Sequence, residues 1–296
     1  MNLFFINNNT SLFCSILAIE HLGLDWAKSV AGLSRGTNGE WLPFNKTYDL
    51  ETKAGFKEFQ SLIKNQATGF KVFAPHDGSS RGLRQRAIKS TFCQKVYYLE
   101  EGLLSYKTHP FRLSSDAKKL CRLPLLGKRF EKLLEKPLFS AFNPYFLALS
   151  RDAFPFADRD SIIAVEKPEK FLRYYAPRIS QPAFIMLATP AEPFEPILYA
   201  YKKISDFQET RDVYLKLHPD AHKERYREMT KEITSKAKRI GARLLDAGTV
   251  IEAEVLLHGH HLIGNPTTSL AFYAEMLGGE YTAVNPWADV NPTSQI

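Results

Sequence analysis

The chain has few cysteines, no long hydrophobic run and no recognisable leader, and these absences narrow its class. Its three cysteines, Cys14, Cys93 and Cys121, are an odd number without metal-like spacing, which fits a reducing compartment. No apolar run approaches the roughly 20 residues of a membrane-spanning helix. The apolar stretch 1–24 lacks a basic beginning and is interrupted by asparagines, unlike a signal peptide. We therefore expect a cytoplasmic protein.

The charge balance favours anionic partners. The 296 residues carry a net charge of +7, and much of the basic charge lies in 118–136, where lysines and arginines are interleaved with leucines. The plainer interpretation of this segment is a solvated basic helix and loop. The alternative is an amphipathic surface that makes peripheral contact with anionic lipid of the inner membrane. No nucleic-acid partner is expected, because the sequence carries no zinc-finger or RNA-recognition signature.

Short apolar runs alternate with segments of helical periodicity, which predicts an α/β fold. The predicted strands are 3–6, 71–74, 96–99, 182–187 and 213–217, and the predicted helices are 12–22, 81–89, 194–204, 220–240 and 268–277. Val250–Leu257 is interpreted as a strand or the approach to one. Two successive strand–helix series predict two Rossmann-like domains, 1–175 and 176–296, that face one another across a cleft.

Three short motifs lie where a predicted strand ends or a predicted helix begins. They are Glu100-Glu101-Gly102 after strand 96–99, Lys216-Leu217-His218-Pro219 at the end of strand 213–217, and Thr267-Thr268-Ser269-Leu270 at the start of helix 268–277. Doubly wound sheets bind ligands at such strand ends and helix N-termini. Proline biases the preceding residue towards extended geometry, so His218 is expected to end its strand. The plainer alternative is a strand-end histidine bonded to backbone.

The order and context of these motifs resemble bacterial sialyltransferases of the GT-B architecture, which use CMP-activated sialic acid. That family carries an acidic pair before glycine, then His-Pro, then a pair of hydroxyl residues. Lys216 and the run Glu254–Leu256 also stand where the family pattern has lysine and Glu-Val-Leu. The likeness spans about residues 96–272. Leu217 stands where some relatives have glycine, and Thr268-Ser269 replaces a serine pair, which keeps the hydroxyls but leaves the subfamily undecided.

The resemblance implies an inverting, metal-independent sialyltransferase. It would move sialic acid from the donor CMP-sialic acid, with no further cofactor, to a glycan acceptor hydroxyl. The acceptor class expected is galactose-type, in a bacterial surface polysaccharide or lipooligosaccharide. Two alternatives stay open: a transferase of another CMP-sugar such as CMP-Kdo, and a non-enzymatic basic binding protein.

The resemblance also implies a role for each motif residue. One of Glu100 and Glu101, with Glu100 preferred by position, would take the proton from the acceptor hydroxyl. Protonated His218 would donate to or stabilise the phosphate of the departing CMP. The other donor-binding residues are Thr268 and Ser269 at the phosphate, Lys216 near the cytosine, Pro219 beside the histidine, and Glu254 at the ribose hydroxyls.

Three further residues are weaker candidates for the acceptor side. Asn8 and Asn9 follow the first predicted strand, and His76 follows the strand 71–74; each is also a common turn former. The run His258–His261 raises the alternative of a metal site. Its spacing suits neither a zinc-binding helix nor a zinc ribbon, so no metal site is predicted.

Overall fold

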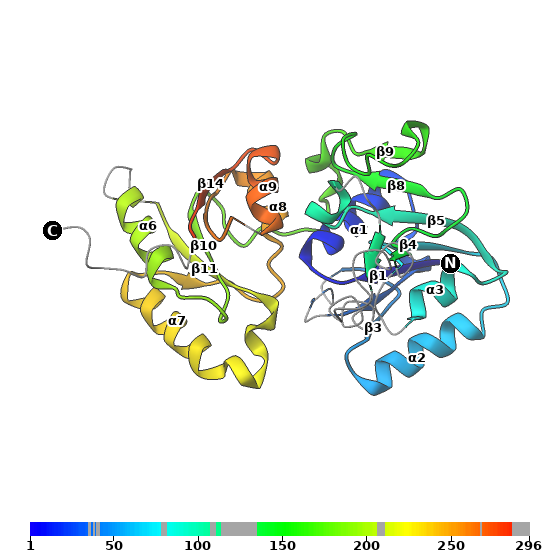
Figure 1. The fold of residues 1–296 in the computed structure, drawn as a ribbon, viewed down its shortest axis with the longest axis horizontal. Coiled ribbons are helices and arrows are strands. Elements are labelled where there is room, and N and C mark those ends of the chain that lie inside the picture. The colour runs from blue at the N-terminus through cyan, green and yellow to red at the C-terminus, as the bar shows by residue number, and fades with distance from the viewer. Residues whose placement is uncertain are drawn as a thin grey trace, which may run out of the picture. The chain divides into compact units, whose positions relative to one another are not determined.

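The computed structural model describes residues 1–34, 37, 39, 42–77, 82–106, 111–113, 135–205, 211–266 and 268–285. Most of the basic segment 118–136 therefore lies outside the described residues. By its contacts the chain divides into two compact units, which Figure 1 shows with their elements labelled. The first unit comprises 1–6, 24–32 and 44–166, and the second comprises 7–23, 33–43 and 167–296. The predicted domains 1–175 and 176–296 do not anticipate that two early segments group with the second half, and the predicted boundary and cleft stay predictions.

The first unit is built on a sheet of seven strands. Their order is β3-β2-β1-β4-β5-β8-β9, and β1, β4, β5, β8 and β9 pair in parallel. The strands are β1 (Asn2–Ile6), β2 (Ser29–Leu33), β3 (Lys46–Asp49), β4 (Phe70–Ala74), β5 (Cys93–Leu99), β8 (Tyr145–Ala148) and β9 (Ile162–Ala164). A separate antiparallel pair is formed by β6 (Phe111–Leu113) and β7 (Glu135–Pro137).

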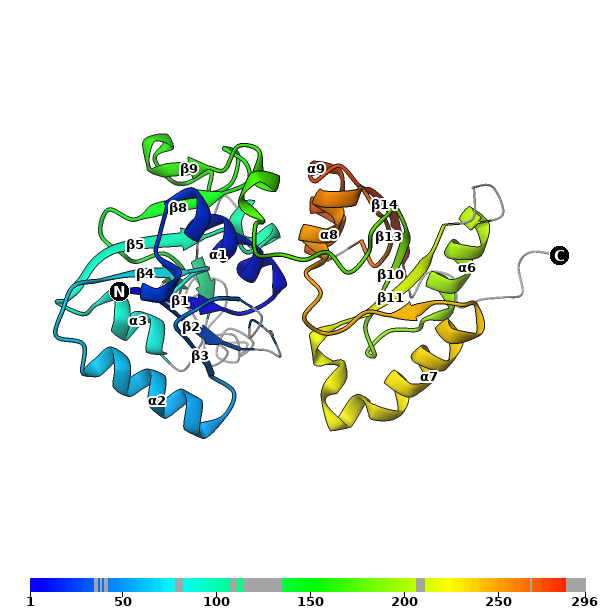
Figure 2. The ribbon, with the colours of Figure 1, turned by 180° about the vertical axis from the view of Figure 1, so that it is seen from behind.

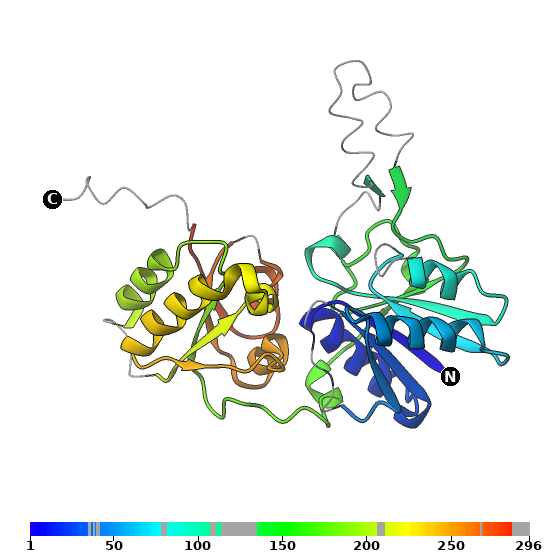
Figure 3. The same cartoon turned by 90° about the horizontal axis from the view of Figure 1, so that it is seen from below.

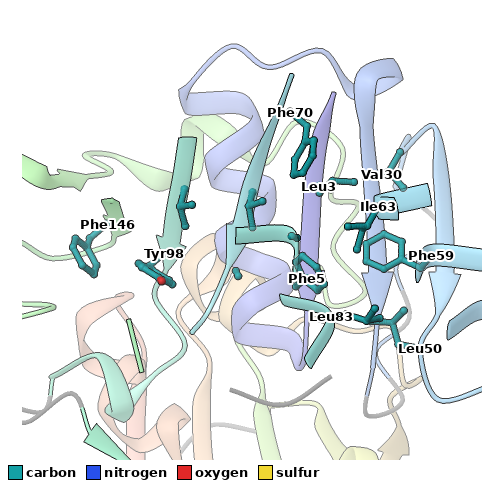
Figure 4. Packing of buried hydrophobic residues seen from close by; sticks show 14 of the residues in the cluster. Leu3, Phe5, Val30, Leu50, Phe59, Ile63, Phe70, Leu83, Tyr98 and Phe146 are labelled. Carbon is teal, nitrogen blue, oxygen red and sulfur yellow. The ribbon is translucent and has the colours of Figure 1, made fainter. Parts of the chain in front are cut away.

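Helices α2 (Lys53–Lys64) and α3 (Leu83–Ile88) cover one face of this sheet (Figure 2). The apolar face of α2 points inward because Phe59 and Ile63, four residues apart, lie on the same side of a helix. They pack against alternate residues of the strands, Leu3 and Phe5 among them (Figure 4). This buried layer fixes the strand ends on which the polar residues of the unit are mounted.

Short helices of the 3-10 type connect several elements. In the first unit they are η1 (Trp26–Lys28), η3 (Leu103–Tyr106) and η4 (Arg159–Ser161), and in the second η5 (Pro168–Phe171), η6 (Pro219–His222) and η7 (Glu224–Tyr226).

The second unit holds a parallel sheet of five strands in the order β12-β11-β10-β13-β14. Its strands are β10 (Phe184–Ala188), β11 (Val213–Leu217), β12 (Arg243–Leu244), β13 (His261–Gly264) and β14 (Glu280–Ala283). Numbered in chain order this is 3-2-1-4-5, the arrangement of a Rossmann-type half. The chain order therefore reverses at β10, which has β11 on one side and β13 on the other.

Helices cover both faces of the second sheet. On one face lie α6 (Glu195–Ser205) and α7 (Arg227–Arg239), and on the other α8 (Ile251–His258) and α9 (Ser269–Met276) (Figures 1 and 3). The α6 and α7 side buries Phe184 and Met186 of β10 against Ile197 and Ile233. Helix α1 (Asn9–His21) contacts α8 and η5, which is why it groups with this unit although it follows β1 in the chain.

The structure confirms the predicted strands and most predicted helices, with two differences. The interpretation of Val250–Leu257 as a strand is wrong, because Ile251–His258 forms α8. Its first five residues are all buried, so the run lacks the helical periodicity that separates a half-buried helix from a buried strand. The predicted helix 220–240 is divided into the turns η6 and η7 followed by α7, Arg227–Arg239.

Candidate functional site

A cavity of about 420 Å³ lies within the second unit, at the carboxyl ends of its central strands. Thr189, His218 and Asn265, the residues that follow β10, β11 and β13, all line it. These three strands flank the point where the chain order of the sheet reverses. Doubly wound sheets bind their ligands at this point, and the volume is that of a small-molecule site.

Three helices begin at the cavity. Their lining residues are Asn8, Asn9 and Thr10 at the start of α1, Ile251 and Glu252 in α8, and Thr268, Ser269 and Leu270 in α9. Helix α1 is closed by a reciprocal capping box between Asn8 and Ser11, whereas the side chain of Val250 makes no capping hydrogen bond to α8. Because unbonded N–H groups and the helix dipoles direct positive potential to these ends, the cavity favours an anionic ligand.

Lys216 adds a cation to the same wall. Its side chain is almost fully buried, and Nζ donates to the carbonyl oxygens of Asp246 at 2.7 Å and Ala247 at 3.1 Å. Burial lowers the pKa of Lys216 to about 8, and the charges of Asp246 and Glu252 oppose that shift. The ammonium group is therefore held in place by backbone, with a pKa near the physiological range.

His218 ends its strand, as the proline after it predicts. Strand β11 stops at Leu217, and the His218 N–H still donates to the Ala188 carbonyl oxygen at 2.8 Å. Pro219 then starts the turn η6, although its side chain lies outside what the structure describes. The histidine is exposed and lines the cavity. This backbone geometry leaves the imidazole available to a ligand.

The predicted hydroxyl pair lies at the beginning of α9. Thr268 is the N-cap, and its Oγ1 accepts from the Ala271 N–H at 3.2 Å and lies 3.3 Å from the Tyr281 hydroxyl. Ser269 is the first helical residue and also lines the cavity. The structure thus brings together six of the residues singled out from the sequence: Asn8, Asn9, Lys216, His218, Thr268 and Ser269.

Glu254 lies elsewhere. It is fully buried and accepts hydrogen bonds from the Tyr175 hydroxyl, from Arg178 N at 2.8 Å and from Ile179 N at 3.2 Å. Its carboxylate thus ties α8 to the segment that precedes β10, and it does not line the cavity. Glu252, two residues earlier on α8, is the carboxylate of that helix that does. This differs from the predicted role of Glu254 at a ribose.

In the first unit, Glu100 follows β5 and is fully buried. Its Oε1 accepts from the Tyr106 hydroxyl and its Oε2 from Leu149 N, each at 2.7 Å. Its own N–H donates to the Leu147 carbonyl oxygen at 3.0 Å. Both carboxylate oxygens of Glu100 therefore serve to hold the chain segments after β5 and β8 together.

Glu101 has a different environment. Its side chain is 10% exposed, and Oε2 lies 3.2 Å from Nε2 of His76, which follows β4. The carbonyl oxygen of His76 accepts from Nη1 of the buried Arg84 at 3.2 Å. Burial lowers the pKa of Arg84 to about 10, while the charges of Glu101 and Asp77 oppose this. The structure therefore pairs two predicted site residues, Glu101 and His76, above a buried cation.

The histidine run at 258–261 has structural partners. Nδ1 of His260 accepts from Ala183 N at 3.1 Å, and burial lowers the pKa of His260 to about 4. Nε2 of His261 lies 2.8 Å from the Thr282 hydroxyl. Among the described residues, no group of three or more His, Cys, Asp or Glu side chains is placed to hold a metal ion. Likewise, none of the described helices is long and apolar enough to span a membrane.

Comparison with solved structures shows what the whole chain is similar to. A protein from Listeria monocytogenes taken to be a UDP-N-acetylglucosamine 2-epimerase superposes with a TM-score of 0.50 at 14% identity, covering 96% of this chain and 78% of that one. With the two Rossmann-like sheets described above, this likeness shows the fold class. The fold is of the GT-B type.

Two further structures are less similar. The UDP-GlcNAc 2-epimerase of Neisseria meningitidis, solved with UDP-GlcNAc bound, gives a TM-score of 0.42 at 11% identity, covering 96% of this chain and 82% of that one. A sialyltransferase from Photobacterium damsela gives 0.39 at 10% identity, covering 95% and 81%. No protein-family model matches the chain, and no curated protein matches it.

Four cavity residues escaped the sequence analysis: Thr10, Glu192, Glu252 and Asn265. Asn265 directly follows β13 and donates from Nδ2 to Glu192 Oε1 at 2.8 Å. A strand ending at Gly264 would have pointed to Asn265, because polar residues after parallel strands gather at one edge. Recognition of α8 as a helix would have placed Glu252 in its first turn.

Proposed function

We propose that the chain is an inverting, metal-independent glycosyltransferase that moves sialic acid from CMP-sialic acid to a glycan hydroxyl. The observation that supports this most is a single cavity lined by Lys216, His218, Thr268 and Ser269. The motif resemblance assigns these four residues to donor binding, although they come from two segments far apart in the chain. A chance match of motifs gives no reason for them to meet.

The donor phosphate belongs at the start of α9 in this proposal. Ser269 and the first N–H groups of the helix bind its oxygens, and His218 faces the same cavity from the end of β11. Lys216 supplies positive charge from the neighbouring wall. These groups stabilise the negative charge that develops on CMP as it leaves, so that protein groups do the work that a divalent cation does in other transferases.

The transfer itself is a single displacement. The acceptor oxygen attacks the anomeric carbon of the sialic acid while the bond from that carbon to the phosphate oxygen breaks, which inverts the anomeric centre. The acceptor proton passes to a carboxylate, and His218 donates a proton or a hydrogen bond to the departing phosphate.

We assign the base to Glu101 in place of the positionally preferred Glu100. Two observations support this: Glu100 is fully buried with both carboxylate oxygens bonded within the protein, and Glu101 retains exposure beside His76. A general base must reach the proton that it removes. Glu100 then acts by holding the segment that carries Glu101.

The fold likeness to a protein taken to be a UDP-N-acetylglucosamine 2-epimerase supports a second candidate, an epimerase acting on that nucleotide sugar. The decisive experiment incubates the purified chain separately with CMP-Neu5Ac, CMP-Kdo and UDP-GlcNAc and measures nucleotide release and sugar products. The proposal expects CMP release from CMP-Neu5Ac, faster with a galactose-type acceptor and unaffected by excess EDTA. Release from CMP-Kdo alone, or conversion of UDP-GlcNAc to its 2-epimer, would move the assignment. Absence of turnover and of nucleotide binding with all three would leave a non-enzymatic binding protein.

A further inference from the structure

Glu252 places a buried carboxylate in the wall of the cavity. It is 3% exposed, and its Oε1 accepts from the Thr10 hydroxyl at 2.6 Å. Within the part of the chain that the structure describes, its Oε2 has no hydrogen-bond partner. Burial raises the pKa of Glu252. An unpaired buried carboxylate oxygen is costly, so a native structure that keeps one usually completes it with a ligand or an ordered water.

Thr10 comes from the other end of the chain, in the first turn of α1. It is 3% exposed, and its hydroxyl reaches across to α8. Its neighbour Asn9 reinforces the contact, because Nδ2 donates to the Thr249 carbonyl oxygen at 3.2 Å. The two bonds join the start of α1 to the start of α8. Since Oε1 is occupied, the remaining acceptor of Glu252 is directed away from Thr10.

The charges of the cavity divide it into two ends. His218, Thr268 and Ser269 form an end suited to phosphate, whereas a carboxylate repels a phosphate in a site of low dielectric. The neutral part of a nucleotide, its nucleoside, is therefore the part that fits beside Glu252. A nucleoside offers two kinds of hydrogen-bond donor to a carboxylate oxygen: the hydroxyls of the ribose and, in cytosine, the exocyclic amine.

We propose that Thr10 is a positioning residue that holds Glu252 so that Oε2 accepts a hydrogen bond from an O–H or N–H donor of the nucleoside. This rests on the proposed function, since it takes the ligand to be a nucleotide. It assigns a helix from the beginning of the chain to the donor site, and it makes the Thr10–Glu252 pair a determinant of nucleotide specificity.

Calorimetric titration of CMP, 2′-deoxy-CMP and UMP into the purified chain tests this. Glu252→Gln should weaken CMP about 10- to 100-fold, as expected for a lost hydrogen bond to a charged group. Thr10→Val, which removes the hydroxyl at nearly constant volume, should weaken CMP about 5- to 10-fold. Thr10→Ser should bind like wild type. Ser15→Ala is the matched control, because it removes another buried hydroxyl of α1 that bonds only to the Ser11 carbonyl oxygen and does not line the cavity.

The choice of ligand identifies the donor group. If the ribose hydroxyl is bound, Glu252→Gln should change the affinity of 2′-deoxy-CMP much less than that of CMP. If the cytosine amine is bound, the affinity of UMP should be the one little changed. In either case, Thr10→Val in the Glu252→Gln background should have no further effect, because the hydroxyl acts only through the carboxylate.

Two failures are distinguishable. A wild-type chain that binds none of the three nucleotides overturns the proposed function. A wild-type chain that binds CMP, with Thr10→Val and Glu252→Gln both unchanged or with additive losses in the double variant, overturns this inference alone. Thermal unfolding of each variant checks that it is folded; if Thr10→Val does not fold, Glu252→Gln with the three nucleotides still decides whether the carboxylate binds the nucleoside.

Discussion

The two units carry polar residues at equivalent places, after the central parallel strands, but satisfy them differently. After β5 in the first unit, both carboxylate oxygens of Glu100 are bonded within the protein, and Glu101 is paired with His76. After β11 and in the helices of the second unit, His218 and Ser269 line a cavity and Glu252 keeps an oxygen without a partner among the described residues.

This difference separates two tasks. A group that acts on a proton must be held in one orientation, which a network of internal hydrogen bonds does at no cost in ligand affinity. A group that binds a ligand must instead leave its hydrogen-bonding capacity unused until the ligand arrives. The first unit has the features of the former and the second those of the latter, and the following variants test that division.

The largest effect is expected for Glu101. Glu101→Gln should lower kcat by roughly 10² to 10⁴, because the acceptor proton loses its carboxylate, while CMP affinity in the second unit stays near wild type. Steady-state transfer and CMP titration measure the two quantities. If transfer continues at the wild-type rate, Glu101 is not the base.

Glu100→Gln provides the contrast. One of its oxygens becomes an amide that faces a donor from Tyr106 or Leu149, so the free energy of unfolding should fall by about 1–3 kcal/mol. Chemical denaturation measures this loss. A stable Glu100→Gln chain that binds CMP but transfers nothing would return the role of base to Glu100.

His218→Ala should reduce turnover about 100-fold or more by removing the proton donor to the phosphate. A donor with a better leaving group should recover part of the rate, since the missing proton then matters less. His222→Ala is the control, because His222 lies four residues on in η6 and does not line the cavity. Equal losses in the two variants would point to disturbed folding of the turn and not to chemistry.

Within the hydroxyl pair, ligand binding and helix capping can be separated. Ser269→Ala should weaken CMP by about 1–3 kcal/mol, as for a lost bond to a charged group, with little effect on stability. Thr268→Ala should also lower stability by about 1 kcal/mol, because Thr268 caps α9 through Ala271 N. Thr268→Ser should restore both. Unchanged CMP affinity in Ser269→Ala would remove Ser269 from the phosphate site.

The smallest effect is a pH dependence of nucleotide affinity. Burial lowers the pKa of Lys216 to about 8, so the ammonium form predominates below pH 8 and is lost as the pH rises through that value. The phosphate of CMP stays doubly charged over this range. CMP affinity should therefore fall between pH 7 and pH 9, by at most about tenfold per pH unit. Lys216→Arg should flatten this profile, and an equally steep profile in Lys216→Arg would assign it to another group.

Local features were sufficient for much of the fold and half of the site. A continuous apolar run such as Val213–Leu217 can only be a buried element of its length, and a proline after His218 acts on the residue next to it. For the same reason, the strand ends that carry Glu100, His76, Asn9 and His218 were predictable. So was the start of α9, where a hydroxyl residue precedes a helical segment.

The sequence by itself determined which residues stand at strand ends and helix starts, because those are short-range matters of periodicity, capping and proline geometry. Only the tertiary structure decided which of two adjacent acids is buried, as with Glu100 and Glu101, and which of two acids on α8 reaches the cavity, as with Glu252 and Glu254. It also decided that Thr10 meets Glu252. These outcomes depend on partners such as Tyr106, Leu149 and Tyr175, and packing between segments distant in the chain leaves no mark on local sequence.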